Sequence, residues 1–264
     1  MDPGTIRWQR TIRPDFPEIL SRSLAMNLLA PARHFDPEHP EMIDRAGFDR
    51  ESLREELQLL EYTNRRFGGH ALMLHYIGRF LRSFHVTSLN LLDLGTGAAD
   101  VPRAIVGWAR NCGVPITVTA VDGNSNVLGL AEEWCRDWPE ICLQQFDLRE
   151  LPYAAASFDL VLCSLTLHHF GGNDAIAILR RIREIARFGC ILNDLRRNWL
   201  AIWASELMAR TVMRDSIFRE DAPQSCRAAF TVRELRDMAA QAGFRNFRVK
   251  RHHAFFRMVL EERN

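Results

Sequence analysis

The sequence has no hydrophobic run long enough to cross a membrane. No stretch approaches the roughly 18 consecutive apolar residues that a spanning helix needs, and no apolar segment follows the first residues as it does in a secretory signal. The formal net charge of +1 is also too small to neutralise many phosphate groups. We therefore expect a soluble, cytoplasmic protein with neither a membrane nor a nucleic acid among its partners.

Cysteine and histidine show none of the spacings that mark metal sites. The six cysteines include no C-x-x-C pair, and the nine histidines include no H-E-x-x-H motif. Most of the cysteines lie in apolar strand or helix patterns, where a free thiol behaves as a small hydrophobic side chain. The sequence therefore predicts buried free thiols and no metal site.

The sequence does have the composition of an ordinary folded protein. Hydrophobic residues make up 47% and charged residues 25% of the 264 positions, values that exclude a disordered or fibrous chain. This length suits one mid-sized α/β domain with an added segment better than several independent domains.

From Leu89 onward, short apolar runs alternate with segments of helical periodicity. This order is typical of successive βα units and of a mostly parallel sheet. We expect five strands, at 89–94, 116–121, 141–146, 158–163 and 190–193. Gly113 and Gly189 are placed to end two of the helices between them, and Thr231 with Glu234 predicts a capping box for a later one. Two alternating segments, 247–250 and 254–260, predict an antiparallel pair at the sheet edge.

Nearly ninety residues precede this core. They carry helical patterns at about 18–29, 50–66 and 71–84, and three prolines lie between the first two. We divide the chain into a segment of residues 1–88 and a core of residues 89–264. Since open α/β sheets bind ligands at the carboxyl ends of their strands, we interpret the first segment as a helical cap over that edge, with a plain helical brace as the alternative.

A glycine-rich turn follows the first strand of the core. Gly95, Thr96 and Gly97 allow a ligand to approach the backbone closely, and the next helix presents unpaired N–H groups to it. A nicotinamide dinucleotide fingerprint needs a third glycine where Asp100 stands, and a carboxylate there repels a pyrophosphate. Asp93 adds a second negative charge, which suits a ligand with an ammonium and a sulfonium. Asp100 either orients that ammonium or caps the helix.

Acidic residues also follow the next two strands. Asp122 ends the second strand, where a carboxylate can accept hydrogen bonds from both hydroxyls of a ribose. Asp147 comes directly after the third strand and can accept a hydrogen bond from an adenine amino group, while Phe146 and Leu148 flank the ring. Each acid alone could be a loop or cap residue, but their order at successive strand ends predicts a nucleoside site.

These motifs resemble those of class I S-adenosylmethionine-dependent methyltransferases, closest to the ubiquinone/menaquinone-type and polyketide-associated enzymes that act on small molecules. The residues that carry the resemblance are 91–102, 121–122, 146–147 with 151–152, 157–161, 167–170, 193–197 and 227–231. The last two segments, together with 64–69, also resemble a bacterial subgroup associated with type III polyketide synthases. Ala99 replaces the third glycine that many relatives carry.

The resemblance implies a Rossmann-like, seven-stranded methyltransferase sheet that is mostly parallel, with an antiparallel carboxyl-terminal edge and an amino-terminal helical cap. It implies S-adenosyl-L-methionine as the cofactor, with the carbonyl of Ser164 near its amino-acid end. The cofactor-binding residues are then expected to be Asp93, Gly95, Thr96, Gly97, Asp100, Asp122, Gly123, Asn124, Asp147, Leu148 and Ser164.

Candidate residues for the methyl acceptor lie on the same edge. His168 and His169 follow the fourth strand, and histidine titrates near neutral pH, so either could act as a base or contact the acceptor. The alternative is that one of these histidines packs in the wall of the pocket and the other faces solvent. The residues expected to line the acceptor pocket are Asn64, Asp194, Arg197 and Trp203. Asp194 is equally well placed to begin a helix. The apolar run 199–203 could line a substrate channel, but residues at helical spacing more often form core.

We therefore expect an enzyme that methylates oxygen or carbon of a small, aromatic, phenolic or quinone-like acceptor in secondary metabolism. Residues 164–167 lack the Pro-Pro-aromatic clamp of nucleic-acid methyltransferases. The alternatives are a cyclase-type enzyme that retains the cofactor and a cofactor-binding subunit without catalysis. A small-molecule acceptor is the expected partner, and a homodimer is left open.

Overall fold

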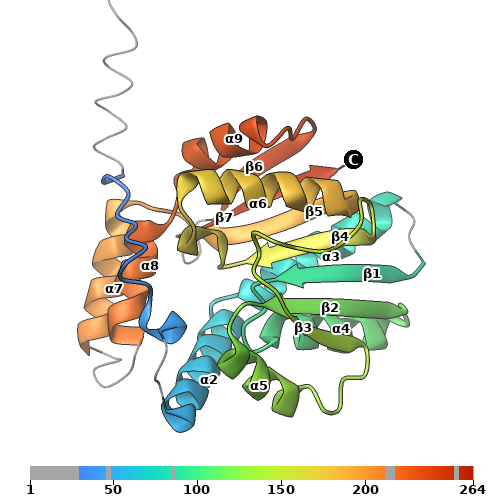
Figure 1. The fold of residues 1–264 in the computed structure, drawn as a ribbon, viewed down its shortest axis with the longest axis horizontal. Coiled ribbons are helices and arrows are strands. Elements are labelled where there is room, and N and C mark those ends of the chain that lie inside the picture. Colours follow the sequence, from blue (N-terminus) through green and yellow to red (C-terminus); the bar gives the residue numbers. More distant parts are fainter. Residues whose placement is uncertain (1–29, 46–48, 85–86, 212–217, 253–255, 264) are drawn as a thin grey trace, which may run out of the picture.

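The computed structural model describes residues 30–45, 49–84, 87–211, 218–252 and 256–263, and a seven-stranded sheet forms its centre (Figure 1). The strands are β1 (Leu89–Leu94), β2 (Ile116–Asp122), β3 (Ile141–Gln145), β4 (Phe158–Ser164), β5 (Ala186–Leu195), β6 (Phe247–His252) and β7 (Arg257–Arg263). Their order is β3-β2-β1-β4-β5-β7-β6. Strands β1 to β5 pair in parallel, and β7 pairs antiparallel with β5 and β6. The predicted Rossmann-like sheet with an antiparallel edge is confirmed.

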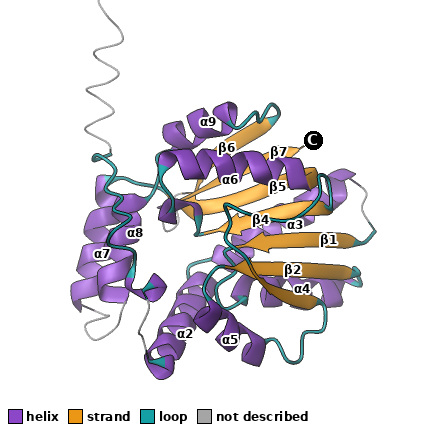
Figure 2. Cartoon of the chain, in the orientation of Figure 1, coloured by secondary structure: helices purple, strands orange, loops and turns teal. Residues whose placement is uncertain are grey.

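Helices cover both faces of the sheet and its carboxyl-terminal edge (Figure 2). They are η1 (Met42–Asp44), α2 (Arg50–Arg66), α3 (Gly69–Phe84), α4 (Asp100–Cys112), α5 (Ser125–Trp134), η2 (Leu167–His169), α6 (Gly172–Ile185), α7 (Trp199–Thr211), α8 (Phe218–Ala228) and α9 (Val232–Gln241). The predicted capping box of Thr231 and Glu234 begins α9. No helix was predicted at α8, and the helix predicted at 18–29 lies outside the described residues. None of the described helices is long and apolar enough to cross a membrane.

The core consists of two apolar layers, one on each face of the sheet. Successive side chains of a strand point to opposite faces, so Leu91 packs with Ile105 of α4 while Leu92 packs with Ile178 of α6. Both leucines are fully buried. A parallel strand covered on both faces needs apolar residues throughout, which explains the continuous runs in the sequence.

The cysteines are free thiols, as predicted, but not all of them are buried. Cys135, Cys163 and Cys190 are buried among apolar side chains. Cys112 and Cys142 are exposed, so the prediction of burial was wrong for them. Cys112 is the last residue of α4, and Cys142 lies in β3, the outermost strand on its side of the sheet.

Gly189 lies inside β5 and does not end a helix, which corrects the prediction from sequence. Helix α6 ends at Ile185, and β5 begins at the next residue. A Cβ atom at position 189 would lie 2.1 Å from the carbonyl oxygen of Glu262 in β7. The glycine is therefore needed for the close approach of the antiparallel strand.

The helices that precede the sheet divide between two positions. Helix α3 packs on the sheet through Met73, Tyr76 and Phe80. Helix α2 lies instead beyond the carboxyl ends of the parallel strands, where α7 and α8 also lie (Figure 1). The carboxyl-terminal edge of the parallel strands is thus covered by helices from both sides of the sheet in the sequence, α2 before it and α7 and α8 after β5.

Candidate functional site

A cavity of about 1320 Å³ opens where β1, β2 and β4 end. Its lining includes every residue predicted to bind the cofactor, together with Asn64, His168 and His169. Pockets for a single small ligand usually measure roughly 300–1,000 Å³. The cavity is therefore large enough to hold a cofactor and an acceptor side by side.

Thr166 connects the glycine turn to the end of β4 through packing and hydrogen bonds. Gly95 has a φ of 67°, and a Cβ atom on it would lie 2.2 Å from Cγ2 of Thr166. The threonine Oγ1 donates to the carbonyl of Ser164 at 3.0 Å and lies 3.3 Å from the carbonyl of Gly95. Glycine is required at position 95 because the threonine fills the space of a side chain. No pattern in the sequence indicates this contact.

Asp122 joins the end of β2 to the turn. Its Oδ2 accepts a hydrogen bond from the backbone N–H of Gly97 at 2.8 Å, and its Oδ1 accepts one from the backbone N–H of Asn124 at 2.9 Å. A carboxylate can accept about four hydrogen bonds. These two bonds fix the carboxylate at the wall of the cavity, in the position predicted for binding a ribose.

Asp93 is a buried carboxyl group beneath the turn, with 2% of its surface exposed. Burial raises the pKa of Asp93 to about 7, and the charges of Asp100 and Asp122 add to this effect, whereas a hydrogen bond with Thr96 opposes it. Three carboxyl groups therefore meet at one end of the cavity. Such a cluster favours a cationic ligand and disfavours a pyrophosphate.

Asp100 is held by two side chains from the preceding helices. Its Oδ2 lies 2.7 Å from Nε2 of His70 and accepts a hydrogen bond from Asn64 at 2.8 Å. Burial acts to raise the pKa of Asp100, but these hydrogen bonds outweigh it and lower the pKa overall. Asp100 is the first residue of α4 and its N-cap is Ala99, but the Asp100 carboxyl also has a hydrogen bond with the backbone of Val101, as the helix-capping alternative predicts. Ala99 itself has a φ of 57°, which explains why glycine suits this position.

Asp147 and Leu148 line the cavity beyond the end of β3. Asp147 forms an ion pair with Arg149, whose Nη2 lies 2.5 Å from Oδ2, and hydrogen bonds from Arg149 lower the pKa of this carboxyl. An adenine amino group bound as predicted would therefore share the Asp147 carboxylate with Arg149.

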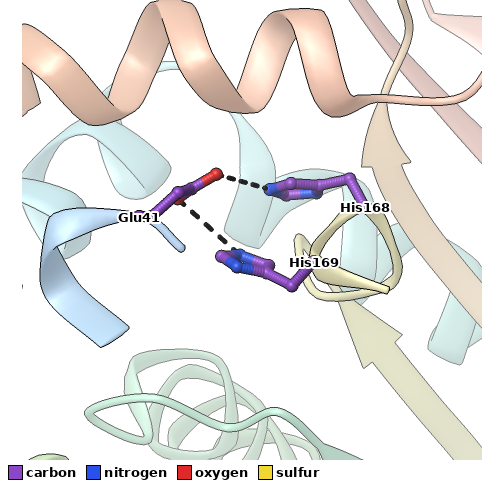
Figure 3. Close-up of side chains that lie close together, drawn as sticks. All are labelled: Glu41, His168 and His169. Atoms are coloured by element: carbon purple, nitrogen blue, oxygen red, sulfur yellow. Dashed lines mark ion pairs between the residues drawn. The ribbon is translucent and has the colours of Figure 1, made fainter. Parts of the chain in front are cut away.

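The two histidines meet a carboxylate from the amino-terminal segment (Figure 3). Nε2 of His168 lies 3.7 Å from Oε1 of Glu41, and Nε2 of His169 lies 3.8 Å from Oε2. On its other side, Nδ1 of His168 lies 2.6 Å from Oδ1 of Asp194. Asp194 is buried in β5, so the alternative that it begins a helix was wrong.

Glu41 was not predicted as a site residue. It lies in a proline-rich stretch without periodicity and reaches the histidines only through the fold. Oδ1 and Oδ2 of Asp221 in α8 accept hydrogen bonds from the backbone of Met42 and Ile43 and hold this stretch in place. The hydroxyl of Ser225 donates to Oε1 of Glu41 at 2.6 Å.

Arg257 was also missed, although an arginine within the apolar run 254–260 is unusual. It is 6% exposed and lines the cavity, and its Nη2 donates to Oδ1 of Asn64 at 3.2 Å. Burial lowers the pKa of Arg257 to about 10. Within the part of the chain that the structure describes, its Nε and Nη1 have no hydrogen-bond partner.

Three residues expected to line the acceptor pocket, Asp194, Arg197 and Trp203, line neither cavity. Arg197 is buried and donates to the carbonyls of Pro31 and Ala229 and to the carboxylate of Glu234, so it fastens segments together. Trp203 is 60% exposed and lines neither of the described cavities. It lies on the outer face of α7 with the exposed residues Trp199, Leu200 and Leu207, whereas Ala201 and Ile202 of the same run are buried and Ala201 lines the larger cavity.

Comparison with known proteins agrees with this geometry. Residues 92–192 match the family model of a methyltransferase domain. No functionally curated protein matched the chain. This part of the chain is thus similar to a methyltransferase domain, and S-adenosyl-L-methionine is the cofactor that this similarity indicates.

Several solved structures share the fold. An S-adenosylmethionine-dependent methyltransferase from Aquifex aeolicus is 14% identical with a TM-score of 0.55, and the match covers 82% of this chain and 98% of that one. The plantazolicin methyltransferase BpumL, solved with S-adenosylhomocysteine, is 12% identical with a TM-score of 0.60, over 80% and 90% of the two chains. The CMeT domain of the citrinin polyketide synthase is 13% identical with a TM-score of 0.51, over 66% and 46%. At these identities the likeness establishes the fold.

Proposed function

We propose that this methyltransferase domain transfers the methyl group of S-adenosyl-L-methionine to an oxygen or carbon atom of a small, apolar acceptor, of aromatic, phenolic or quinone-like chemistry, in secondary metabolism. The observation that carries the proposal is the single cavity that joins the acidic glycine turn to the histidine pair. Two proteins of similar fold, BpumL and the citrinin synthase domain, belong to natural-product biosynthesis by their names.

The residues of the turn are suited to hold the cofactor. Bound there, S-adenosyl-L-methionine supplies an electrophilic methyl group on a sulfonium. Asp93 and Asp100 place negative charge near its ammonium and sulfonium, and Asp122 accepts hydrogen bonds from its ribose. Asp147 and Leu148 frame the adenine. The residues with these roles stand at the ends of β1, β2 and β3, which are neighbours in the sheet.

The acceptor side of the cavity is apolar and lies beside the histidines. Small and apolar side chains of α2 and α7 line it, namely Leu57, Leu60, Ala201, Ala204 and Met208. Methyl transfer requires an aligned nucleophile and the exclusion of water more than it requires new charge stabilisation. We infer that this wall orients a flat apolar molecule, and that His168 and His169 contact its reacting group or accept its proton.

The first experiment compares the binding of S-adenosyl-L-methionine and NAD by calorimetry. We expect a clear preference for S-adenosyl-L-methionine, and equal or no binding of the two would refute the cofactor site. The second experiment follows S-adenosylhomocysteine formation with a panel of phenols and quinones. Tight cofactor binding without product on any acceptor would favour a cofactor-binding subunit or a cyclase-type enzyme over a transferase.

A further inference from the structure

We propose that Glu41, His168 and His169 form a binding site for a divalent transition metal ion, with zinc as the best match. One oxygen of Glu41 and one ring nitrogen of each histidine all lie within 4.8 Å of one another (Figure 3). Two imidazole nitrogens and a carboxylate are a common ligand set for zinc sites that keep an open position. The proposal reverses the expectation of no metal drawn from sequence spacing.

The distances suit a shared ion better than direct hydrogen bonds. The nitrogen-to-oxygen separations of 3.7 Å and 3.8 Å exceed the usual 2.7–3.2 Å of a hydrogen bond. Two ligands that each lie about 2.1 Å from a tetrahedral zinc ion are about 3.4 Å apart. The three ligand atoms lie within 4.8 Å of one another, so the side chains would close by at most about 1.4 Å to reach that spacing.

Neighbouring side chains hold two of the three proposed ligands, His168 and Glu41. Asp194 lies 2.6 Å from Nδ1 of His168, so an ionised Asp194 keeps the proton on Nδ1 and directs the lone pair of Nε2 toward Glu41. A carboxylate behind a histidine ligand is the usual outer support of a zinc site. Ser225 supports Glu41 in the same way by donating to Oε1.

Burial argues for a positive charge at this place. Glu41 is 8% and His168 2% exposed. A buried carboxylate is costly unless a cation or several hydrogen bonds compensate it. The nearby cation Arg33 donates instead to the carbonyls of His168 and Phe170. A metal ion would neutralise Glu41 without displacing this arginine.

An ion could reach the site and keep a position open for a ligand. Glu41, His168 and His169 line both the 1320 Å³ cavity and a second cavity of about 720 Å³, so they lie in the wall between the two. A hydroxyl group bound to the ion from the larger cavity would lose its proton to water more readily. This effect on a hydroxyl group matters only if the proposed methyl transfer takes place, whereas binding of the ion does not depend on the proposed function.

Metal titration of the whole protein, after tag removal and dialysis against a chelator, tests the site. We expect one equivalent of zinc by calorimetry, and one equivalent of cobalt with visible absorption bands of nitrogen and oxygen ligation. His168→Gln, His169→Gln and Glu41→Gln should each weaken zinc binding at least about 100-fold, and Asp194→Asn about 10- to 100-fold. His39→Ala is the matched control, because His39 lines the smaller cavity but pairs with Asp36.

The proposal is overturned if the wild-type protein binds no stoichiometric zinc, or if a variant with both histidines replaced binds zinc as the wild type does. Circular dichroism confirms that each variant is folded, and His169→Gln is the variant most tolerant of change because its side chain is partly exposed. Cofactor binding is measured on the same metal-free samples. Cofactor binding without zinc binding refutes only the metal site, and zinc binding without cofactor binding refutes only the proposed function.

Discussion

The carboxylate of Asp194 contacts His168 twice, since Oδ2 accepts the backbone N–H at 3.1 Å and Oδ1 lies 2.6 Å from Nδ1 of the ring. This arrangement fixes both the orientation of the imidazole and the nitrogen that carries its proton. The Nε2 atom is thereby directed into the wall between the two cavities. The chemistry at this edge therefore depends on a residue that does not itself line either cavity.

Replacing Asp194 with asparagine should lower methyl transfer at least about 10-fold while cofactor affinity changes less than about 2-fold. An asparagine amide can donate to Nδ1 and so stabilise the wrong tautomer of His168. The measurement is the rate of S-adenosylhomocysteine formation together with the calorimetric Kd of the cofactor. Asp237→Asn, at an exposed position of α9, is the control. A variant with an unchanged rate would exclude a positioning role for Asp194.

Cofactor binding should depend on pH through Asp93. Its pKa of about 7 means that a proton must leave before the carboxylate can pair with a cationic ligand. We expect affinity to rise as the pH increases from 6 to 7.5 and to level off above that. The Asp93→Asn variant should bind more weakly and without this dependence. Calorimetry in buffers of different ionisation enthalpy measures the proton released, and an absence of release at pH 6.5 would contradict the assignment.

The same carboxyl group also has a consequence for stability. Because the folded-state pKa of Asp93 lies above its ordinary value of 3.8, the folded protein binds a proton that the unfolded chain has lost. Its stabilising contribution is complete below about pH 4 and is lost as the pH rises through 7. At pH 8 Asp93→Asn should therefore raise the free energy of unfolding, by at most about 4 kcal/mol. Thermal unfolding at pH 5 and pH 8 measures the difference.

Replacing Asp122 with alanine should weaken cofactor binding about 100-fold. Two hydrogen bonds to a charged acceptor, each of about 1.5 kcal/mol or more, are lost with the carboxylate. The variant also removes the bond that holds Gly97 in the turn. Asp137→Ala, at an exposed position after α5, is the control for the loss of one acidic residue. Wild-type affinity in the Asp122 variant would show that the ribose is not bound there.

Arg257→Met should lower kcat/KM at least about 10-fold without lowering the thermal midpoint of unfolding. The side chain is buried with two nitrogens that lack partners among the described residues, so removing its charge relieves an uncompensated desolvation. We expect those nitrogens to bind an oxygen atom of the cofactor or the acceptor. Arg196→Met is the matched control, because Arg196 also has an unpartnered Nε but does not line the cavity. Equal kinetics in both variants would argue against a ligand contact.

The sheet and the cofactor turn could be predicted because their signals are local. The apolar runs of β1 and β2 reflect burial on both faces, and Asp122 stands at a strand end whose position follows from the run itself. Helix α8 was missed because Pro223 and several charged residues interrupt its pattern. Gly189 was misplaced because its reason lies in the backbone of β7, more than seventy residues away in the sequence.

The acceptor side was less predictable because its residues come from distant parts of the chain. Glu41 and Arg257 reach the cavity from the two ends of the sequence, and each owes its position to tertiary hydrogen bonds. Trp203 shows the opposite error, since a large aromatic residue at helical spacing suggests burial but lies on the exposed face of α7. Periodicity identifies the apolar face of a helix only when that face packs on a core.

The contact between Gly95 and Thr166 constrains how this protein can vary in evolution. The two positions belong to different motifs and lie 71 residues apart in the sequence, yet each occupies space that the other would need. A larger residue at position 95 can be tolerated only with a smaller one at position 166 and a different link between β1 and β4. In homologous chains these two positions should therefore vary together, and a lineage that loses the threonine should lose the constraint on the glycine.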